Sequence, residues 1–278
     1  MGTAQGVVTE VSDIGPHIRR VVFEVPDLDS LGLPDAGDAA LGLYFPEPGQ
    51  PGPPDMDGEP EGRNYSVRRR DGRQVTCDFV LHERGLAARW VRRAAPGQRV
   101  AVDHARSWYR PEPATSWQLL VADLSGLPAL ARILDELPAD TEAAAIVEVA
   151  DRADLNYLPQ RSDIPVVGTI GTGNGLAPSR LPELVRAHPH PGGRGYCWFA
   201  GEAQATRMVR KYLRSEYGWV PDQYDIVGYW RFDSETWDRK YEAVSVEVEA
   251  IYERALADGK SAKAAAEEYD LALERVGL

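Results

Sequence analysis

The sequence predicts a small antiparallel β-barrel, followed by a parallel-sheet α/β domain and a C-terminal helical extension. In the first 110 residues, short β-branched runs bounded by turn residues are typical of a small barrel. After the proline-containing segment 110–116, strands alternate with helices, which indicates βαβ units and a parallel sheet. The length of 278 residues favours two domains at about 150 residues each. We place the boundaries at 1–112, 113–231 and 232–278.

The predicted barrel contains six strands and one short helix. Six prolines and four glycines between residues 46 and 62 exclude a helix or a central strand there, because proline fixes φ and lacks an N–H donor. The helix is expected at 86–95, where Pro96 and Gly97 end it. The strands are expected at 6–11, 18–25, 41–45, 64–68, 74–81 and 99–102.

The predicted α/β domain contains five strands and three helices. Leucine and alanine residues recur at helical spacing between 127 and 137 and predict the first helix. Two further helices are expected at 180–187 and 202–216. The strands are expected at 117–122, 143–149, 164–170, 195–200 and 225–229.

The helical extension begins after Arg231. Its apolar residues alternate in spacings of four and three, which predicts a helix with one apolar face. These residues are Trp237, Tyr241, Val244, Val248, Ile251 and Ala255. We expect this face to pack on the body of the protein, with a dimer seam as the alternative. A second helix is expected at 261–275, after Gly259.

Charge, cysteine content and the first residues of the chain narrow the functional class. A net charge of −12 argues against a general binder of nucleic acid or anionic membranes. Residues 61–110 depart from this average, because their 12 arginines and 5 acidic residues give a net charge of +7. Cys77 and Cys197 fit neither a metal-site spacing nor a disulfide framework, so we expect free, partly buried thiols. Lacking a signal-peptide pattern or a spanning apolar run, the sequence predicts a soluble cytoplasmic protein without membrane insertion.

The first of three chemical motifs, Arg63-Asn64-Tyr65-Ser66, opens a predicted strand. An arginine pairs with a phosphate in a forked geometry. A tyrosine ring offers a contact to a flat heterocycle, and a serine hydroxyl can hydrogen-bond the edge of that heterocycle. A surface arginine beside a core tyrosine is the alternative interpretation of this short pattern.

The second motif, FVLHERGLAARW at 79–90, passes from a strand through His82 and Gly85 into a helix that starts with small residues. Free N–H groups at such a helix start can bind a diphosphate. An ordinary strand–turn–helix with Trp90 in the core is the alternative.

The third motif, DLSGLPAL at 123–130, follows the first strand of the predicted parallel sheet. Open α/β sheets bind their ligands at the carboxyl ends of such strands. A plain N-cap turn made by Ser125 is the alternative.

Together the motifs resemble those of the siderophore-interacting protein family, FAD-dependent ferric-siderophore reductases related to ferredoxin reductases. The resemblance covers residues 5–231 and includes, in order, 63–66, 79–90, Pro96-Gly97, 123–129, 196–202 (YCWFAGE) and 228–231 (GYWR). Two motifs differ from the family pattern. Leu86 replaces the proline of G-P-A, and Leu124, Ser125 and Gly126 replace E-T-A in D-E-T-A-L-P-A.

The resemblance implies a six-stranded antiparallel Greek-key barrel that binds FAD, followed by a ferredoxin-reductase-like α/β domain. It also implies that NAD(P)H or a ferredoxin reduces the FAD. The flavin then reduces Fe(III) in an anionic ferric siderophore, and the iron is released. No metal site of the protein is required. The implied cofactor-binding residues are Arg63, Asn64, Tyr65, Ser66, Val67, His82, Gly85, Leu86, Ala87, Ala88, Asp123, Ser125 and Trp230.

Other residues are expected to contact the substrate and the reductant. For the siderophore these are Arg68, Arg231, Arg239 and Lys240, and for the reductant they are Pro128, Trp198, Gly201 and Glu202. The arginines around the predicted hairpin turn at Asp71-Gly72 form either a solvated tip or part of the flavin cleft.

Two further functions and one further motif stay open at this point. The chain could be a flavin reductase with another electron acceptor, or a siderophore-binding accessory protein without catalysis. The segment GTGNGLAP at 171–178 looks like the nicotinamide loop G-T-G-x-x-P of ferredoxin reductases, but it comes two strands too late in the chain. We expect a flexible loop before helix 180–187 and leave open that it lines the cofactor cleft.

Overall fold

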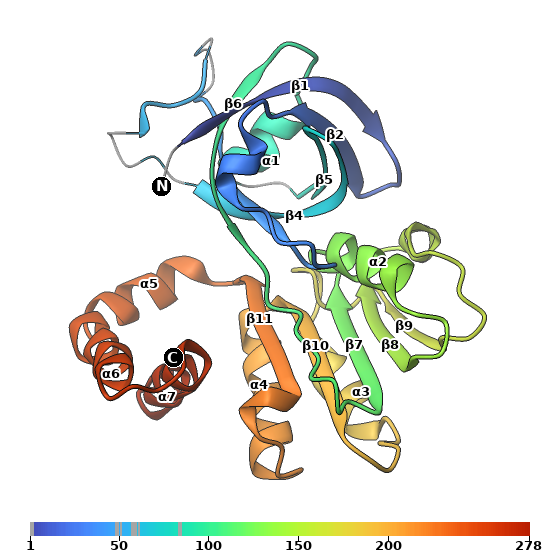
Figure 1. Cartoon of the computed structure of the whole chain (residues 1–278), viewed down its shortest axis with the longest axis vertical. Helices are drawn as coiled ribbons and strands as arrows, with labels where there is room; N and C mark the ends of the chain where they lie inside the picture. Colours follow the sequence, from blue (N-terminus) through green and yellow to red (C-terminus); the bar gives the residue numbers. More distant parts are fainter. Residues whose placement is uncertain (1–2, 48–49, 51, 57–59, 61, 83–84) are drawn as a thin grey trace.

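A computed structural model describes residues 3–47, 50, 52–56, 60, 62–82 and 85–278. Part of the expected loop 46–62 lies outside these residues, as do Glu83 and Arg84 of the second motif. The described chain forms a barrel, a parallel sheet flanked by helices, and a group of three C-terminal helices beside the sheet (Figure 1). This arrangement confirms the predicted fold class. The exact boundaries between the three parts stay a prediction.

Six antiparallel strands close the barrel in the Greek-key order β1-β2-β5-β4-β3-β6. Alternating side chains on these strands point inward and build an aromatic core, in which Tyr65 packs 4.5 Å from Phe79 and Trp90 packs 4.7 Å from Phe45, measured between ring centroids. The strands are β1 Ala4–Asp13, β2 Ile18–Glu24, β3 Ala40–Tyr44, β4 Gly62–Asp71, β5 Gln74–Val80 and β6 Arg99–Arg106, and a 3₁₀ turn covers Leu28–Leu31.

The one helix of the barrel, α1, is shorter than the sequence predicts. It spans Leu86–Val91 rather than 86–95. Beyond Val91 the backbone tightens into turns in which Arg93 N donates to Trp90 O and Ala94 N donates to Val91 O. The chain then reaches the Pro96-Gly97 turn without a further helical turn.

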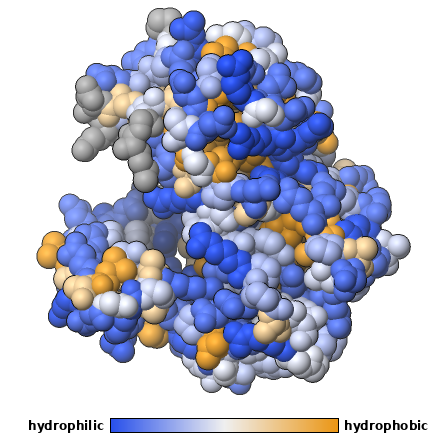
Figure 2. Space-filling model, in the orientation of Figure 1, coloured by the Kyte–Doolittle hydropathy of each residue, from blue (hydrophilic) through white to orange (hydrophobic). Residues whose placement is uncertain are grey.

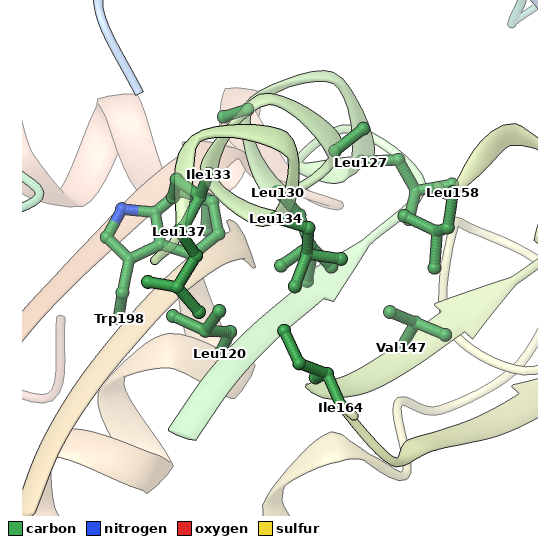
Figure 3. Close-up of a cluster of buried hydrophobic side chains, with 14 of the residues drawn as sticks. Leu120, Leu127, Leu130, Ile133, Leu134, Leu137, Val147, Leu158, Ile164 and Trp198 are labelled. Carbon is green, nitrogen blue, oxygen red and sulfur yellow. The ribbon is translucent and has the colours of Figure 1, made fainter. Parts of the chain in front are cut away.

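The second part is a five-stranded parallel sheet in the order β11-β10-β7-β8-β9. Helix α2 covers the face directed toward the barrel, where its leucines pack on Leu120 and Val147 of the sheet (Figure 3). The strands are β7 Trp117–Asp123, β8 Glu142–Val149, β9 Val166–Ile170, β10 Gly195–Glu202 and β11 Tyr224–Trp230. The helices are α2 Leu127–Glu136, α3 Leu181–Ala187 and α4 Ala203–Ser215, with 3₁₀ turns at Arg152–Tyr157 and Pro221–Gln223.

The C-terminal extension differs from the single apolar stripe that the sequence predicts. The chain breaks at Ala243–Val244, where Val244 has φ −126° and ψ −3°, so two helices replace the expected one. They are α5 Ser234–Glu242 and α6 Ser245–Ala257, followed by α7 Ala262–Arg275.

The apolar stripe of this extension packs mainly within the extension. Val248 lies in a small core with Leu273 of α7. The partly buried residues that pack against this core, Tyr241 among them, all belong to the extension. The extension is attached to the sheet largely by charge: Arg214 of α4 pairs with Glu267 and Glu274 at 2.9 Å each. Packing of the stripe on the body of the protein was therefore the wrong expectation, because α7 supplies the apolar partner.

Asp38 joins the barrel to the parallel sheet. Its buried carboxylate accepts hydrogen bonds from the Ser107 hydroxyl at 2.8 Å and from the backbone N–H groups of Trp108 and Tyr109 at 2.9 and 2.8 Å. The indole N–H of Trp198, on β10, donates to the same carboxylate at 3.1 Å. One side chain before β3 thus holds both the linker that leaves the barrel and a strand of the sheet.

Helix α2 makes a second contact between the two parts. Arg132 donates to the carbonyl oxygen of Val67 on β4 at 3.2 Å, and Arg68 pairs with Asp135 at 2.5 Å. Near the other end of the interface, the Tyr157 hydroxyl donates to Asp78 of β5 at 2.5 Å. Polar contacts of Arg132 and Asp135 on α2, and of Tyr157 in the turn that follows β8, therefore join the α/β part to the barrel.

Two predictions concerning the whole chain can be compared with this structure. Cys77 and Cys197 are free and buried, as expected, and burial raises the pKa of both thiols well above the usual range. Among the described residues, no helix combines the length and the apolar character that crossing a membrane requires.

We expect Asp38→Asn to lower the free energy of unfolding by about 2–4 kcal/mol, because the new amide nitrogen would face N–H donors in a buried place. Urea unfolding followed by tryptophan fluorescence measures this change. Asp135→Asn is the matched control: its pair with Arg68 lies partly in solvent, and its loss should cost less than about 1 kcal/mol. Small and equal shifts for both variants would contradict the anchoring role of Asp38.

Candidate functional site

The surface is hollowed between the barrel and the C-terminal helices (Figure 2). A chain of contacts links the elements that meet near this hollow. The Ser66 hydroxyl of β4 lies 3.4 Å from the Tyr229 hydroxyl of β11. Trp230 donates to Asp123 at the end of β7, and Arg231 lies 3.7 Å above the ring of Trp237 on α5. The structure thus brings the first and third motifs and the end of β11 into one region.

The first motif presents its side chains alternately on the two faces of β4. Tyr65 and Val67 point into the barrel core, where Val67 is fully buried and Tyr65 is partly buried. On the other face, Asn64 contacts His104 of β6 at 2.9 Å, and Ser66 is buried beneath Tyr229. Arg63, at the start of the motif, is exposed and directs one guanidinium nitrogen to the Gly62 carbonyl at 2.8 Å.

The second motif ends in a helix start that fits an anion. Gly85 precedes α1 with φ +101°, a conformation that favours glycine, and none of the described side chains caps the first turn. The first N–H groups of α1 have no partner within the helix and are suited to a diphosphate. Leu86 and Ala87 are partly exposed and Ala88 is buried, while the exposed His82 lies just before this turn.

In the third motif, Asp123 is a buried junction between three strand ends. One carboxylate oxygen accepts from Ser125 N at 2.8 Å and from the Ser125 hydroxyl at 2.6 Å. The other accepts from Glu202 N at 2.8 Å and from Trp230 Nε1 at 2.6 Å. Burial raises the pKa of Asp123, and these hydrogen bonds oppose that rise. Asp123 therefore orients the site, and its own oxygens are occupied.

The end of β11 carries the charge of the site. Arg231 is partly buried, and burial together with the neighbouring Arg207 lowers its pKa. Its guanidinium stacks on Trp237, and no ion pair of Arg231 is found among the described residues. Burial raises the pKa of the Tyr229 hydroxyl, which keeps this group neutral and able to donate.

The four residues expected to bind substrate do not all meet. Arg239 and Lys240 lie exposed on α5, the helix whose Trp237 contacts Arg231. Arg68 pairs with Asp135 of α2 instead, and Figure 1 shows α2 and α5 on opposite sides of the sheet. The neighbouring hairpin arginines are also paired, Arg70 with Asp29 at 2.5 Å and Arg73 with Glu24 at 3.2 Å. The basic hairpin thus belongs to the α2 side.

Of the four residues expected to contact the reductant, three are buried, and Trp198 lies in the middle of β10 rather than at the carboxyl edge of the sheet. Trp198 is fully buried and bonded to Asp38, and Pro128 is buried in the first turn of α2. Glu202 caps α4 by accepting from Gln204 N at 2.7 Å, and the preceding Gly201 is buried against Asp123. Only Glu202 of this set is partly exposed.

Sequence reasoning missed the residues whose partners are distant in the chain. Asp38 and His104 each contact a domain partner or a motif residue, but nothing in their local sequence distinguishes them. Tyr229 lies in the motif at 228–231, but its contact with Ser66 could not be predicted from that motif. The described part of the chain contains no group of three or more His, Cys, Asp or Glu side chains that could hold a metal ion.

Two family models match this chain. "Siderophore-interacting FAD-binding domain" matches residues 7–106 and "Siderophore-interacting protein" matches residues 115–233. An uncharacterised protein of Mycobacterium tuberculosis is 30% identical, over 87% of this chain and 95% of its own length. The barrel therefore contains an FAD-binding domain.

This chain is also similar to two relatives that are named as reductases and to one protein of solved structure. The ferric vibriobactin reductase ViuB of Vibrio cholerae is 25% identical over 78% of this chain and 85% of its own. The NADPH-dependent ferric-chelate reductase of Escherichia coli is 26% identical over 80% and 91%. The crystal structure of a siderophore utilization protein from T. fusca superposes with a TM-score of 0.70 at 32% identity, over 83% of this chain and 93% of the other.

Asp123→Asn should lower the free energy of unfolding by about 1–3 kcal/mol and loosen Trp230, because an amide nitrogen cannot accept from Glu202 N or the indole N–H. Urea titration measures the first effect and near-UV circular dichroism the second. Trp230→Phe is the comparison, since it removes one donor and leaves the other bonds of Asp123, at a cost of about 1 kcal/mol. If both variants lose the same stability, Asp123 is not the junction described above.

Proposed function

Because the chain belongs to the siderophore-interacting protein family, we propose that it is an FAD-dependent reductase of ferric siderophores. The observation that carries this proposal is the meeting of the FAD-binding barrel with the end of β11, where Ser66, Tyr229 and Trp230 adjoin the cationic Arg231. Siderophores hold Fe(III) far more tightly than Fe(II), so reduction releases the iron. Bound FAD would supply the electrons for this reduction.

The barrel residues fit FAD in charge and in shape. We assign the diphosphate to Arg63 and to the uncapped first turn of α1, at Gly85, Leu86, Ala87 and Ala88. Among the described residues that are not its chain neighbours, the side chain nearest to a Cβ built at Gly85 is that of His82, at 3.8 Å, so these residues leave the approach to the turn open. His82, exposed beside the turn, is assigned to the same group.

The flat part of the cofactor is assigned to the side where the barrel meets the sheet. Asn64 and Ser66 share the outer face of β4, where Ser66 contacts Tyr229 of β11, and Trp230 follows Tyr229. Ser66 and the amide of Asn64 can hydrogen-bond a heterocycle edge, while Tyr65 supports β4 from the barrel core and Asp123 holds the ring of Trp230 at the end of β11. Val67, Asp123 and Ser125 support this surface from behind, since their side chains are buried or bonded within the protein.

Substrate recognition is assigned to Arg231, Arg239 and Lys240. An anionic ferric siderophore needs a cationic surface, and Arg239 and Lys240 are exposed on α5, the helix whose Trp237 contacts Arg231. Arg231 is held in place by stacking on Trp237 and keeps its N–H donors free of a carboxylate partner. The name of the Escherichia coli relative supports NADPH as the electron donor, with a ferredoxin as the second candidate.

Arg63→Ala should weaken FAD binding about tenfold, which corresponds to the loss of about 1.4 kcal/mol from charge-assisted hydrogen bonds. Equilibrium dialysis or fluorescence titration of the deflavinated protein with FAD measures the affinity. Arg99→Ala is the matched control, because Arg99 is an exposed arginine at the start of β6. Equal affinities for the two variants and the unaltered chain would remove Arg63 from the site.

The function itself is tested by Fe(II) formation. FAD-loaded protein supplied with NADPH, NADH or a reduced ferredoxin should convert ferric siderophores to Fe(II), trapped by a ferrous chelator and read by absorbance. Arg231→Ala should lower this rate at limiting siderophore at least fivefold. Reduction of other acceptors but no ferric siderophore would make the chain a flavin reductase of another kind. Failure to take up FAD would leave the non-catalytic accessory protein.

A further inference from the structure

The glycine-rich segment 171–178 lies across the carboxyl edge of the parallel sheet. It leaves β9 with Gly171 N donating to Val149 O at 2.9 Å, at the end of β8. A small turn follows, in which Gly173 and Ala177 form an antiparallel bridge. The segment therefore turns back over the sheet before it enters α3.

Asn174 at the tip of this turn is bonded to the end of β7. Its side-chain oxygen accepts from Leu124 N at 2.9 Å, and its side-chain nitrogen donates to Glu148 O at 3.1 Å and to Thr172 O at 3.2 Å. Asn174 has φ +54°, and no other non-glycine residue with positive φ is found in the described chain. Asparagine is among the few side chains that tolerate this conformation and can also hydrogen-bond nearby backbone.

Glu148 fixes the base of the same turn. Its buried carboxylate accepts from the Thr172 hydroxyl and from Arg180 N, both at 2.8 Å. Gly173 lies directly against this carboxylate, and any Cβ at that position would collide with it. Close packing onto β8 thus requires glycine at position 173, and positive φ angles of 72° and 80° favour glycine at positions 171 and 175.

The segment also reaches the far side of the edge. A Cβ built at Gly175 would lie 3.9 Å from the ring of Phe232, which follows β11. Since the sheet order is β11-β10-β7-β8-β9, contacts with Val149, Leu124 and Phe232 extend over the ends of β8, β7 and β11. Open α/β sheets bind nucleotides in the crevice outside these carboxyl ends. Here the chain's own segment lies over that place.

We propose that segment 171–178, latched by Asn174, restricts the access of nicotinamide nucleotides to the carboxyl edge, which makes Asn174 a specificity-determining residue for the electron donor. The inference rests on the proposed function, in which such a nucleotide is one donor. In the latched state the Leu124 N–H is occupied by Asn174 and is unavailable to a nucleotide diphosphate. A nucleotide binds only the fraction of molecules with the segment displaced, so its apparent affinity falls by that fraction.

The test uses Asn174→Gly in the full, FAD-loaded chain. Glycine accepts the positive φ and removes only the three side-chain hydrogen bonds, so the latch is lost without backbone strain. Asn156→Gly is the matched control, because Asn156 is exposed on the turn 152–157. A second variant, Thr172→Ala combined with Asn174→Gly, also removes the hydroxyl bond to Glu148.

Calorimetric titration with NADP⁺ and NAD⁺ should give a Kd at least fivefold lower for Asn174→Gly than for the unaltered chain and for Asn156→Gly. Damage to the fold would weaken binding, so a gain in affinity distinguishes a latch from a structural support. Hydrogen exchange of amides 171–178 should accelerate in Asn174→Gly, and in the unaltered chain on addition of saturating nucleotide.

Three results would overturn the proposal. These are an unchanged Kd in both Asn174 variants, no detectable nucleotide binding to any variant, or nucleotide binding to the unaltered chain with amides 171–178 still protected. Each of these results is compatible with Fe(II) formation with a ferredoxin as donor, so the proposed function would still stand. Loss of Fe(II) formation with every donor would instead refute the proposed function, while the nucleotide titrations would still report on the latch.

Discussion

The buried carboxylate of Asp38 is the constraint on which the rest of the structure depends. Both of its oxygens accept hydrogen bonds, from the linker at 107–109 and from Trp198 inside the sheet. A barrel and a sheet of independent cores could meet at many angles, because interfaces between domains are more polar than cores. A fully bonded buried carboxylate removes that freedom, since any rotation would leave a charge without partners.

Asp123 repeats the same device within the site. Asp38 fixes the barrel relative to the parallel sheet. Asp123 fixes the turn after β7 relative to the start of α4 and the end of β11. Both oxygens of each carboxylate accept hydrogen bonds from protein donors, so neither carboxylate is positioned to bind a ligand. Arg231, which follows β11, is oriented instead by the ring of Trp237. This separation lets the site stay cationic above an acidic framework.

The sequence allowed the barrel, the parallel sheet and the family to be predicted, because strand and helix periods and short motifs are local properties of the chain. What depends on distant partners could not be predicted in the same way. The break at Val244 and the packing of the stripe on α7 depend on the geometry of three helices, and α1 ends early through i→i+3 turns beyond Val91. In the site, Ser66 of β4 contacts Tyr229 of β11, while Arg68 pairs with Asp135 of α2 and Trp198 donates to Asp38. The assignment of the motif residues to the cofactor stays a prediction. Spacing along a chain cannot distinguish a ligand contact from such a structural one.

The basic segment 61–110 shows how far local charge can mislead. Its hairpin arginines are neutralised by Asp29, Asp135 and Glu24, so most of their charge supports the barrel and its contact with α2. Arg231, in a part of the chain with a net negative charge, keeps its guanidinium free of an ion pair among the described residues. It achieves this by stacking on Trp237, an interaction that orients a guanidinium without using its N–H donors. An anion that reaches the hollow therefore meets a preoriented donor group and need not compete with a carboxylate for it, so that recognition costs little reorganisation.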